Sequence, residues 1–366
     1  MPSYFETRTR IIALVAIGAS LAALFLRIGG AGGVAVFGAS AVGLAGLAAM
    51  VGEGTEQLSH RLGPKATGVL QSSLGNLPEF FIGIFALRAG LLDVVRAALV
   101  GSILANTLLV LGLAFLVGGL RHGPQKFGTD QTKMMATLLV LAAAAIAIPT
   151  IATFPGGPAH GHETELSIVV SVVLLVVFAG SVPFAIGKGA GGGLPEGPGP
   201  SEPAHASEAT WPMPVAAGVL LGAGLGAAFV SDWFVEALKP AMSTLGMSEA
   251  FAGLVVVAIA GNAVENVVGI QAMLADKADL AISVILNSSL QVALALVPVL
   301  VLASLFIGGA TLTLVVSPLL VAALALTAVL AALVVIDGES TWLEGLALIG
   351  LYVILAASVW WGQPIG

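Results

Sequence analysis

The sequence contains no cysteine, and only 9% of its 366 residues are charged. The absence of cysteine excludes a disulfide framework and any thiolate metal site. Soluble domains carry about 25% charged residues, so the shortage of charge argues against an ordinary water-soluble protein. The net charge of −7 identifies no partner, because the acidic residues lie both in loops and inside apolar segments. We expect no nucleic-acid partner and no cofactor.

Apolar residues are abundant and come in long blocks. They make up 58% of the chain, and the mean hydropathy is +1.06. A helix needs about 20 mostly apolar residues to cross the bilayer core, and the blocks repeatedly reach that length. They are far longer than the roughly 10-residue alternating strands of a membrane barrel. Since only helices and closed barrels satisfy their backbone in lipid, the sequence predicts an all-α integral membrane protein.

Eleven membrane-spanning segments are predicted. Ile11–Leu26 could also be a signal peptide, but Arg27 follows before any small-residue cleavage pattern, so we take this run as the first span. Between the sixth and seventh spans, residues 187–211 are rich in Gly and Pro, which predicts a linker between two halves. The spans lie near 9–27, 31–54, 67–88, 94–119, 132–152, 165–186, 212–235, 248–275, 279–304, 307–336 and 341–361.

Lysine and arginine predict the orientation, because they concentrate in cytoplasmic loops. With the N-terminus in the cytoplasm and the C-terminus outside, the cytoplasmic side receives most of them. These are Arg8, Arg10, Arg61, Lys65, Arg121, Lys126, Lys133, Lys188 and Lys277. The other side keeps Arg27, Arg88, Arg96 and Lys239. We expect a protein of a bacterial inner membrane.

A motif of the first half recurs in the second. Gly75-Asn76-Leu77-Pro78-Glu79 returns 186 residues later as Gly261-Asn262-Ala263-Val264-Glu265, and the same offset pairs Asp93 with Asp279. The chain is therefore predicted to be a duplication, with an extra helix at 1–30, five-helix repeats at 31–186 and 212–366, and a cytoplasmic linker at 187–211. Moving five spans along the chain reverses the crossing direction, so the repeats are inverted, as in many transporters.

Glu79 and Glu265 each fall near the middle of a predicted span. A charged residue there costs about 2.5–3.5 kcal/mol on insertion scales, so it marks a functional site. No Lys or Arg occurs near the middle of a neighbouring span to pair with them, because Arg88 and Arg96 lie at span ends. The alternatives are protonated acids hydrogen-bonded between helices, or a cation bound between the two carboxylates.

Neutral oxygen ligands accompany both acids. Asn76 and Asn262 each precede the glutamate by three residues, a spacing that places both side chains on one helix face. The following spans add oxygen atoms from Ser102, Asn106, Ser288 and Gln291. Each polar residue taken alone could simply form a hydrogen bond between neighbouring helices. Together with two carboxylates they form an all-oxygen set, which suits Ca²⁺ better than softer metals.

The helix that carries Glu79 is predicted to break. Pro78 lacks an N–H, and its ring clashes with the carbonyl of Leu74, while Gly75 allows the chain to yield. In the second repeat Gly261 is kept, but valine replaces the proline. We therefore predict a sharper break in the first repeat, with the Leu74 carbonyl turned toward the site.

Residues 75–119 and 249–303 resemble the two repeat motifs of the cation/calcium exchanger superfamily, and specifically its calcium/proton exchanger family. The stretches that carry the resemblance are GNLPEFFIGIFALRAGLLDVVRAALVGSILANTLLVLG and GLVVVAIAGNAVENVVGIQAMLADKADLAISVILNSSLQVALALVP. The resemblance implies a Ca²⁺/H⁺ antiporter in which Glu79 and Glu265 bind the cation and carry protons. The resemblance also implies that polar side chains of both repeats surround these two glutamates, namely Asn76, Asn262, Ser102, Asn106, Ser288 and Gln291.

The sequence departs from the family at two positions. Asn287 stands where the family usually has glycine, and it could add an oxygen ligand or tolerate an unusual backbone angle. Pro78 is similar to the motif of sodium/calcium exchangers, which leaves the coupling ion open. Exchange of Na⁺ or K⁺ for Ca²⁺, or of a monovalent cation for H⁺, is therefore the alternative. An intramembrane enzyme is disfavoured, because no nucleophile–base pair or HExxH-like motif is present. The oligomeric state is left open.

Two further acids lie near predicted span ends. Glu56 is expected at the cytoplasmic end of the second span and Asp232 near the outer end of the seventh. They could attract cations into opposite vestibules, or simply be solvated helix ends.

Overall fold

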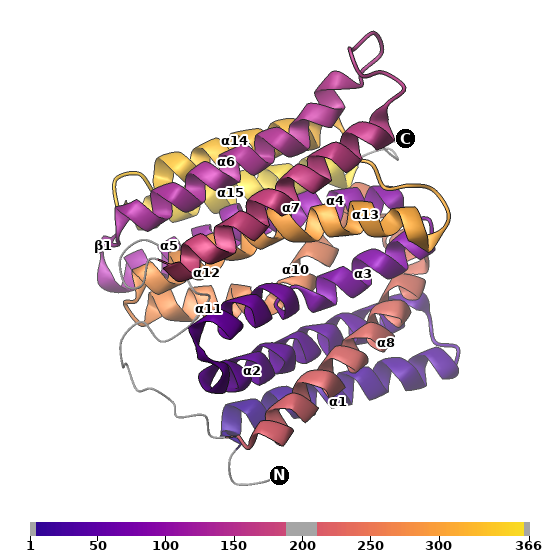
Figure 1. The fold of residues 1–366 in the computed structure, drawn as a ribbon. Helices are drawn as coiled ribbons and strands as arrows, with labels where there is room; N and C mark the ends of the chain where they lie inside the picture. The colour runs from indigo at the N-terminus through magenta and orange to yellow at the C-terminus, as the bar shows by residue number, and fades with distance from the viewer. Residues whose placement is uncertain (1–4, 188–210, 362–366) are drawn as a thin grey trace. The chain divides into compact units, whose positions relative to one another are not determined.

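The computed structural model describes residues 5–187 and 211–361, but not the side chains of 59–74, 129–131, 182–187 and Val264. Most of this part is helical (Figure 1). Within the described residues, eight helices are long and apolar enough to cross a membrane, and a bent pair makes up to nine. The all-α membrane class is confirmed, whereas the count of eleven spans is not. The predicted linker falls almost entirely at 188–210, outside the described residues.

The chain forms two compact units, and each takes segments from both sequence halves. The first contains residues 1–89, 196–247 and 260–264. Its helices are α1 (Thr7–Ile28), α2 (Gly33–Leu74), α3 (Leu77–Arg88) and α8 (Met213–Leu245). The boundaries of the two repeats remain a prediction from the sequence.

The second unit contains residues 90–195, 248–259 and 265–366. In its first half are α4 (Leu92–Leu104), the π-helix η1 (Ala105–Val110), α5 (Leu111–His122), β1 (Gln125–Lys126), α6 (Thr129–Ala152) and α7 (Glu163–Gly187). Its second half begins with α9 (Glu249–Phe251), η2 (Ala252–Val257), the first two residues of α10 (Ala258–Gly261) and all but the first two residues of α11 (Ala263–Leu274). It ends with α12 (Ala278–Gln291), η3 (Val292–Leu296), α13 (Val297–Ile307), α14 (Pro318–Val334), β2 (Glu339–Ser340) and α15 (Trp342–Trp360).

In the first unit, small residues let α1 and α8 pack closely against α2. A Cβ on Gly46 would lie 2.7 Å from the Cα of Ala16, and one on Gly33 would lie 2.6 Å from the Cβ of Pro240. Close approach through small residues is the usual way in which membrane helices associate. At one end of α1, Arg27 also forms an ion pair of 2.7 Å with Glu236 of α8.

The expected gap between the second and third spans is wrong. The sequence analysis ends the second span near residue 54 and begins the third near residue 67, but α2 continues as one helix to Leu74. Hydropathy marks where a helix leaves the membrane and not where the helix ends.

The expected continuous span at 307–336 is also wrong. α13 ends at Ile307, residues 308–317 are not helical, and α14 has only 17 residues. Gly308 and Gly309 both have positive φ, which stops the helix, and Ser317 caps the next helix with Pro318 at its first position. We call residues 308–317 the strap.

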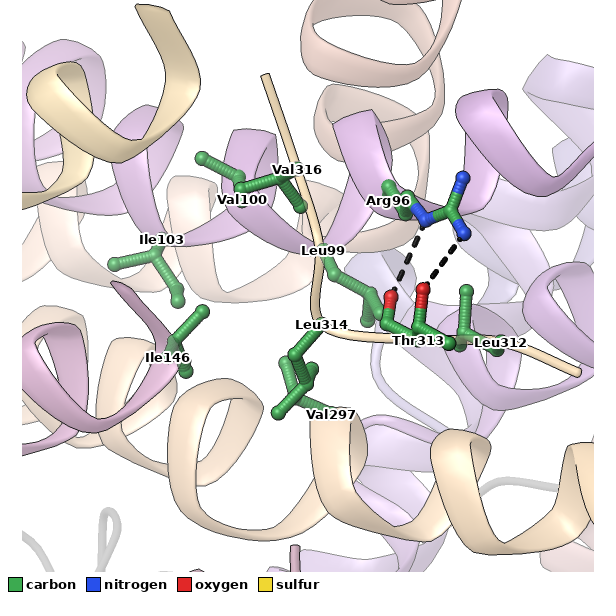
Figure 2. Close-up of a pocket in the computed structure, with 10 residues that line it drawn as sticks. All are labelled: Arg96, Leu99, Val100, Ile103, Ile146, Val297, Leu312, Thr313, Leu314 and Val316. Carbon is green, nitrogen blue, oxygen red and sulfur yellow. Dashed lines mark hydrogen bonds between the residues drawn. The ribbon is translucent and has the colours of Figure 1, made fainter. Parts of the chain in front are cut away.

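Side chains from four helices of the second unit hold the strap. The backbone N–H groups of Leu312, Leu314 and Val316 donate to the hydroxyls of Ser304, Ser167 and Thr150, respectively. Arg96 of α4 donates to the carbonyl and the hydroxyl of Thr313, as Figure 2 shows. Irregular backbone inside a membrane protein requires such partners, since lipid supplies none.

Two short strands that the sequence analysis did not predict join the loops of the second unit. β1 pairs antiparallel with β2, with Gln125 opposite Ser340 and Lys126 opposite Glu339. Two residues per strand carry too little pattern to be recognised from sequence.

Candidate cation site

Glu79 lies in the first turn of α3, directly after the helix break. Gly75 and Asn76 form a turn between α2 and α3, so Pro78 occupies the second position of a new helix, where a missing N–H costs little. The carboxylate is therefore near the positive end of a helix dipole. Its side chain is only 7% exposed.

Asn262, a residue of the second repeat, donates a hydrogen bond to Glu79. Its Nδ2 donates to Oε1 of Glu79 over 2.7 Å, and Asn262 is fully buried. The amide suits both charge states of the acid, because its N–H₂ can donate to a carboxylate and its carbonyl can accept from a carboxylic acid. This pair lies within the first unit and joins the two motifs predicted from the sequence.

Gly261 makes room for the Glu79 side chain. A Cβ built on Gly261 would approach Cγ of Glu79 to less than 3.0 Å, which real Cβ atoms essentially never do. The glycine of the second motif thus has a packing role beside its expected role in the helix break. Sequence reasoning found the residue but not this contact, which joins positions 182 residues apart.

The second repeat breaks at the equivalent position. α10 ends at Gly261, Asn262 forms a turn, and the helices Glu249–Gly261 and Glu265–Leu274 are bent by 64°. Glu265 is half-buried in the first turn of α11, which matches the place of Glu79 in α3. The expectation that each asparagine shares a helix face with its glutamate is wrong in both motifs, because Asn76 precedes α3 and Asn262 precedes α11. That the first break is sharper, with the Leu74 carbonyl released, stays a prediction.

The remaining predicted polar residues lie in the second unit. Asn106 Nδ2 donates to Ser288 Oγ over 2.9 Å, which joins one predicted ligand of each repeat. Ser102, Asn106, Ser288 and Gln291 are all buried. The grouping of this set with Glu79, and of Glu79 with Glu265, stays a prediction.

Two π-helices adjoin these polar residues at equivalent positions. η1 contains Asn106, and η3 begins at Val292, directly after Gln291. Short π-helices are rare and occur frequently at functional sites. Shifted by the offset of the duplication, η1 falls almost on η3. Nothing in the apolar sequence of these spans marks a π-turn, so sequence reasoning missed both.

The chemistry of the buried groups is that of a hard-cation or proton site. Carboxylate, amide and hydroxyl oxygens are the ligands that Ca²⁺ prefers. In the described part of the chain, His, Asp and Glu nowhere form a group of three or more that could hold a metal ion. Any cation bound by the described residues therefore needs neutral oxygen ligands as well.

The two predicted vestibule acids are both exposed. Glu56 lies on α2 and Asp232 on α8, and their suggested role in attracting cations stays a prediction. Sequence reasoning missed Glu53, one turn before Glu56, whose carboxylate accepts a 3.0 Å hydrogen bond from Thr9 of α1. The sequence could have pointed to Glu53, because it is a carboxylate inside an apolar helix, which is the feature that identified Glu79.

Comparison with known proteins gives a consistent result. The pattern of the family described as "Sodium/calcium exchanger protein" matches residues 32–187 and 215–361. The chain is 34% identical to the "Ca(2+)/H(+) antiporter" of Synechocystis sp., with 96% of each chain covered. It is also 34% identical to the "Ca(2+)/H(+) antiporter ChaA" of Bacillus subtilis, with 88% of this chain and 90% of the relative covered.

Two solved structures are similar in fold. "Structure of native YfkE" has a TM-score of 0.80 and 30% identity, with 95% of this chain and 99% of the other covered. "Crystal Structure of H+/Ca2+ Exchanger CAX" has a TM-score of 0.75 at 14% identity, with 96% and 92% covered, which supports the fold alone.

Proposed function

The chain belongs to the sodium/calcium exchanger protein family, and from this premise we propose that it is a secondary antiporter that exchanges Ca²⁺ for H⁺. The relatives named Ca²⁺/H⁺ antiporters support this choice over exchange driven by Na⁺ or K⁺. They also support a transporter and not an enzyme. For the orientation, we propose from the Lys and Arg distribution a bacterial inner-membrane protein with a cytoplasmic N-terminus and an external C-terminus.

The observation that carries the proposal is the buried carboxylate of Glu79, hydrogen-bonded to Asn262 of the other repeat. A charged group in a membrane protein interior is costly unless it is compensated, so it is kept for a partner. Ca²⁺ and protons are such partners and compete for the same oxygen atoms. We propose that Glu79 and its repeat counterpart Glu265 both contribute to this competition.

The polar residues around the acids complete the proposed ligand set. Asn76 and Asn262 belong to the two breaks, and Ser102, Asn106, Ser288 and Gln291 belong to the following spans. Neutral oxygens of this kind replace part of the hydration shell of Ca²⁺. The proposal does not require a metal cofactor, since Ca²⁺ is the substrate.

Charge-neutral substitution tests the assignment. We expect Glu79→Gln and Glu265→Gln each to abolish Ca²⁺ transport in proteoliposomes while leaving a folded, monodisperse protein. Each variant removes one of the two charges that Ca²⁺ and protons share. The control is Glu165→Gln, whose side chain is 69% exposed and which should transport like the wild type. Wild-type Ca²⁺ transport by either test variant would refute the proposed site.

A further inference from the structure

A polar stripe runs along one face of α12. Asp279, Ser283, Asn287 and Gln291 follow one another at intervals of four residues, which places them on one side of the helix. Asp279 is exposed at the start of the helix, and Gln291 is buried at its end, beside η3. The stripe therefore leads from the loop before α12 to a residue of the proposed cation site.

The middle of α12 is exposed only at the residues of this polar stripe. From Ala281 to Leu294, Ser283 and Asn287 are the two residues that are half-exposed, and all others are buried. The side chain of Asn287 makes no hydrogen bond to another residue in the described part of the chain. An amide has four hydrogen-bonding positions, and leaving them unsatisfied in lipid is costly. Contact with water explains both the residue type and its exposure.

The backbone does not explain the asparagine. Asn287 lies inside a regular helix, and Asp276 is the one non-glycine residue with positive φ in the described chain. Asparagine is therefore not needed here for a left-handed backbone conformation.

The equivalent face of the first repeat is apolar and closed. The offset of 186 residues pairs the stripe with Asp93, Ala97, Gly101 and Ala105 of α4 and η1, so only the aspartate is kept. η2 covers this face, because a Cβ on Gly101 would lie 2.5 Å from Leu254 Cα and one on Gly253 would lie 2.7 Å from Ala97 Cβ. In this structure one repeat thus seals the face that the other keeps polar and accessible.

We propose that the stripe lines a water-filled path by which cations and protons reach Ser288 and Gln291, with Asn287 as an ion-contacting residue along it. The path begins at the loop that contains Lys277, which the orientation argument places in the cytoplasm. That Ca²⁺ is the ion that uses it rests on the proposed function. The hydroxyl and amide oxygens stand in for hydration water, as oxygen ligands do in general.

The natural absence of cysteine allows a direct test of water access. We would place single cysteines at Ser283 and Asn287, and measure their modification by a positively charged, water-soluble methanethiosulfonate in nanodiscs. Controls are Val284→Cys on the buried side of α12 and Ile354→Cys, which is 66% exposed on the apolar α15. Thiols react as thiolates, which form in water and not in lipid, so we expect modification at 283 and 287 to be at least about tenfold faster than in both controls.

Modification of both test variants at the rate of Ile354→Cys would overturn the water-filled path. Ser283→Cys replaces one oxygen by sulfur, so it keeps the test valid if Asn287→Cys does not fold. Because labelling does not depend on the cargo, this outcome is distinct from a failure of the proposed exchange, which the Glu79→Gln variant reports.

Removal of the amide tests the contact with the ion. We expect Asn287→Leu to raise KM for Ca²⁺ by about threefold to tenfold with little change in kcat, as befits the loss of one hydrogen-bonding ligand. A wild-type KM in this variant would overturn the ion-contacting role of Asn287.

Discussion

At the scale of single residues, the geometry around Glu79 depends on the absence of a side chain at Gly261. The Glu79 carboxylate rests against this glycine while it accepts a hydrogen bond from Asn262. A glycine in a membrane helix thus positions an acidic side chain of the other repeat. The requirement is steric and does not involve charge.

We therefore predict that Gly261→Ala reduces Ca²⁺ transport at least about tenfold, because a 1 Å displacement of a reacting group can cost 100-fold. The matched control is Gly218→Ala on α8, where an added Cβ would meet nothing within 4 Å. Transport by both variants in proteoliposomes decides the question. Equal, wild-type rates would show that Glu79 tolerates displacement.

The contact between Asn106 and Ser288 predicts coupling between the repeats. Asn106→Ala and Ser288→Ala should each raise KM for Ca²⁺, by about twofold to tenfold for one lost hydrogen bond. Since the two side chains share that bond, the double variant should be little worse than the poorer single variant. Additive effects in this double-mutant cycle would mean that the two residues act independently.

At the scale of elements, the strap between α13 and α14 shows how irregular backbone is stabilised inside the protein. Hydroxyls from three helices satisfy three alternate N–H groups of the strap, and Arg96 holds Thr313 between them (Figure 2). Arg96 also pairs with Asp93 over 2.9 Å, one turn earlier on α4. These contacts connect the strap to the helix that carries Ser102.

Loss of one such hydroxyl should destabilise the protein. Thr150 accepts from the N–H of Val316 and donates to the carbonyl of Leu314, so Thr150→Val removes both bonds without changing the side-chain shape. We expect a loss of about 1–3 kcal/mol in the free energy of unfolding, seen as a lower Tm in detergent. Thr137→Val, an exposed position whose hydroxyl bonds only within its own helix, should change stability by less than about 0.5 kcal/mol. Equal Tm values would contradict the account.

The strap also marks how far the sequence could predict the structure. Long apolar blocks identified the membrane class, because lipid imposes one simple rule on every span. The same rule led to the wrong prediction of a continuous span across the strap, because Leu312, Leu314 and Val316 are as apolar as a span although their backbone is not helical. What distinguishes them is a set of hydroxyl partners distant in the sequence, which no local pattern reveals. The π-helices were missed for the same reason.

The sequence predicted the residues of the candidate site better than the contacts between them. Asn and Glu stand out in apolar helices, and their recurrence at one offset identified Glu79, Asn262 and Glu265. The bond between Glu79 and Asn262 crosses from one repeat to the other, whereas the sequence suggested pairing within each motif. Spacing along a helix predicts neighbours only while the helix continues, and both motifs lie at a break.

At the scale of the whole molecule, the charge of the proposed site explains why transport would be an exchange. We propose that the site carries either Ca²⁺ or protons, and that it is close to neutral in each loaded state. The empty site would carry uncompensated charge, which a low-dielectric barrier disfavours. This difference enforces exchange and prevents leak.

The most direct test of this account is Ca²⁺ uptake into proteoliposomes under an imposed pH gradient, acidic inside, with sodium and potassium absent. We expect uptake that requires the gradient, collapses when an ionophore dissipates it, and is lost in the Glu79→Gln variant. Uptake that needs sodium and ignores the pH gradient would contradict the central claim and favour sodium/calcium exchange.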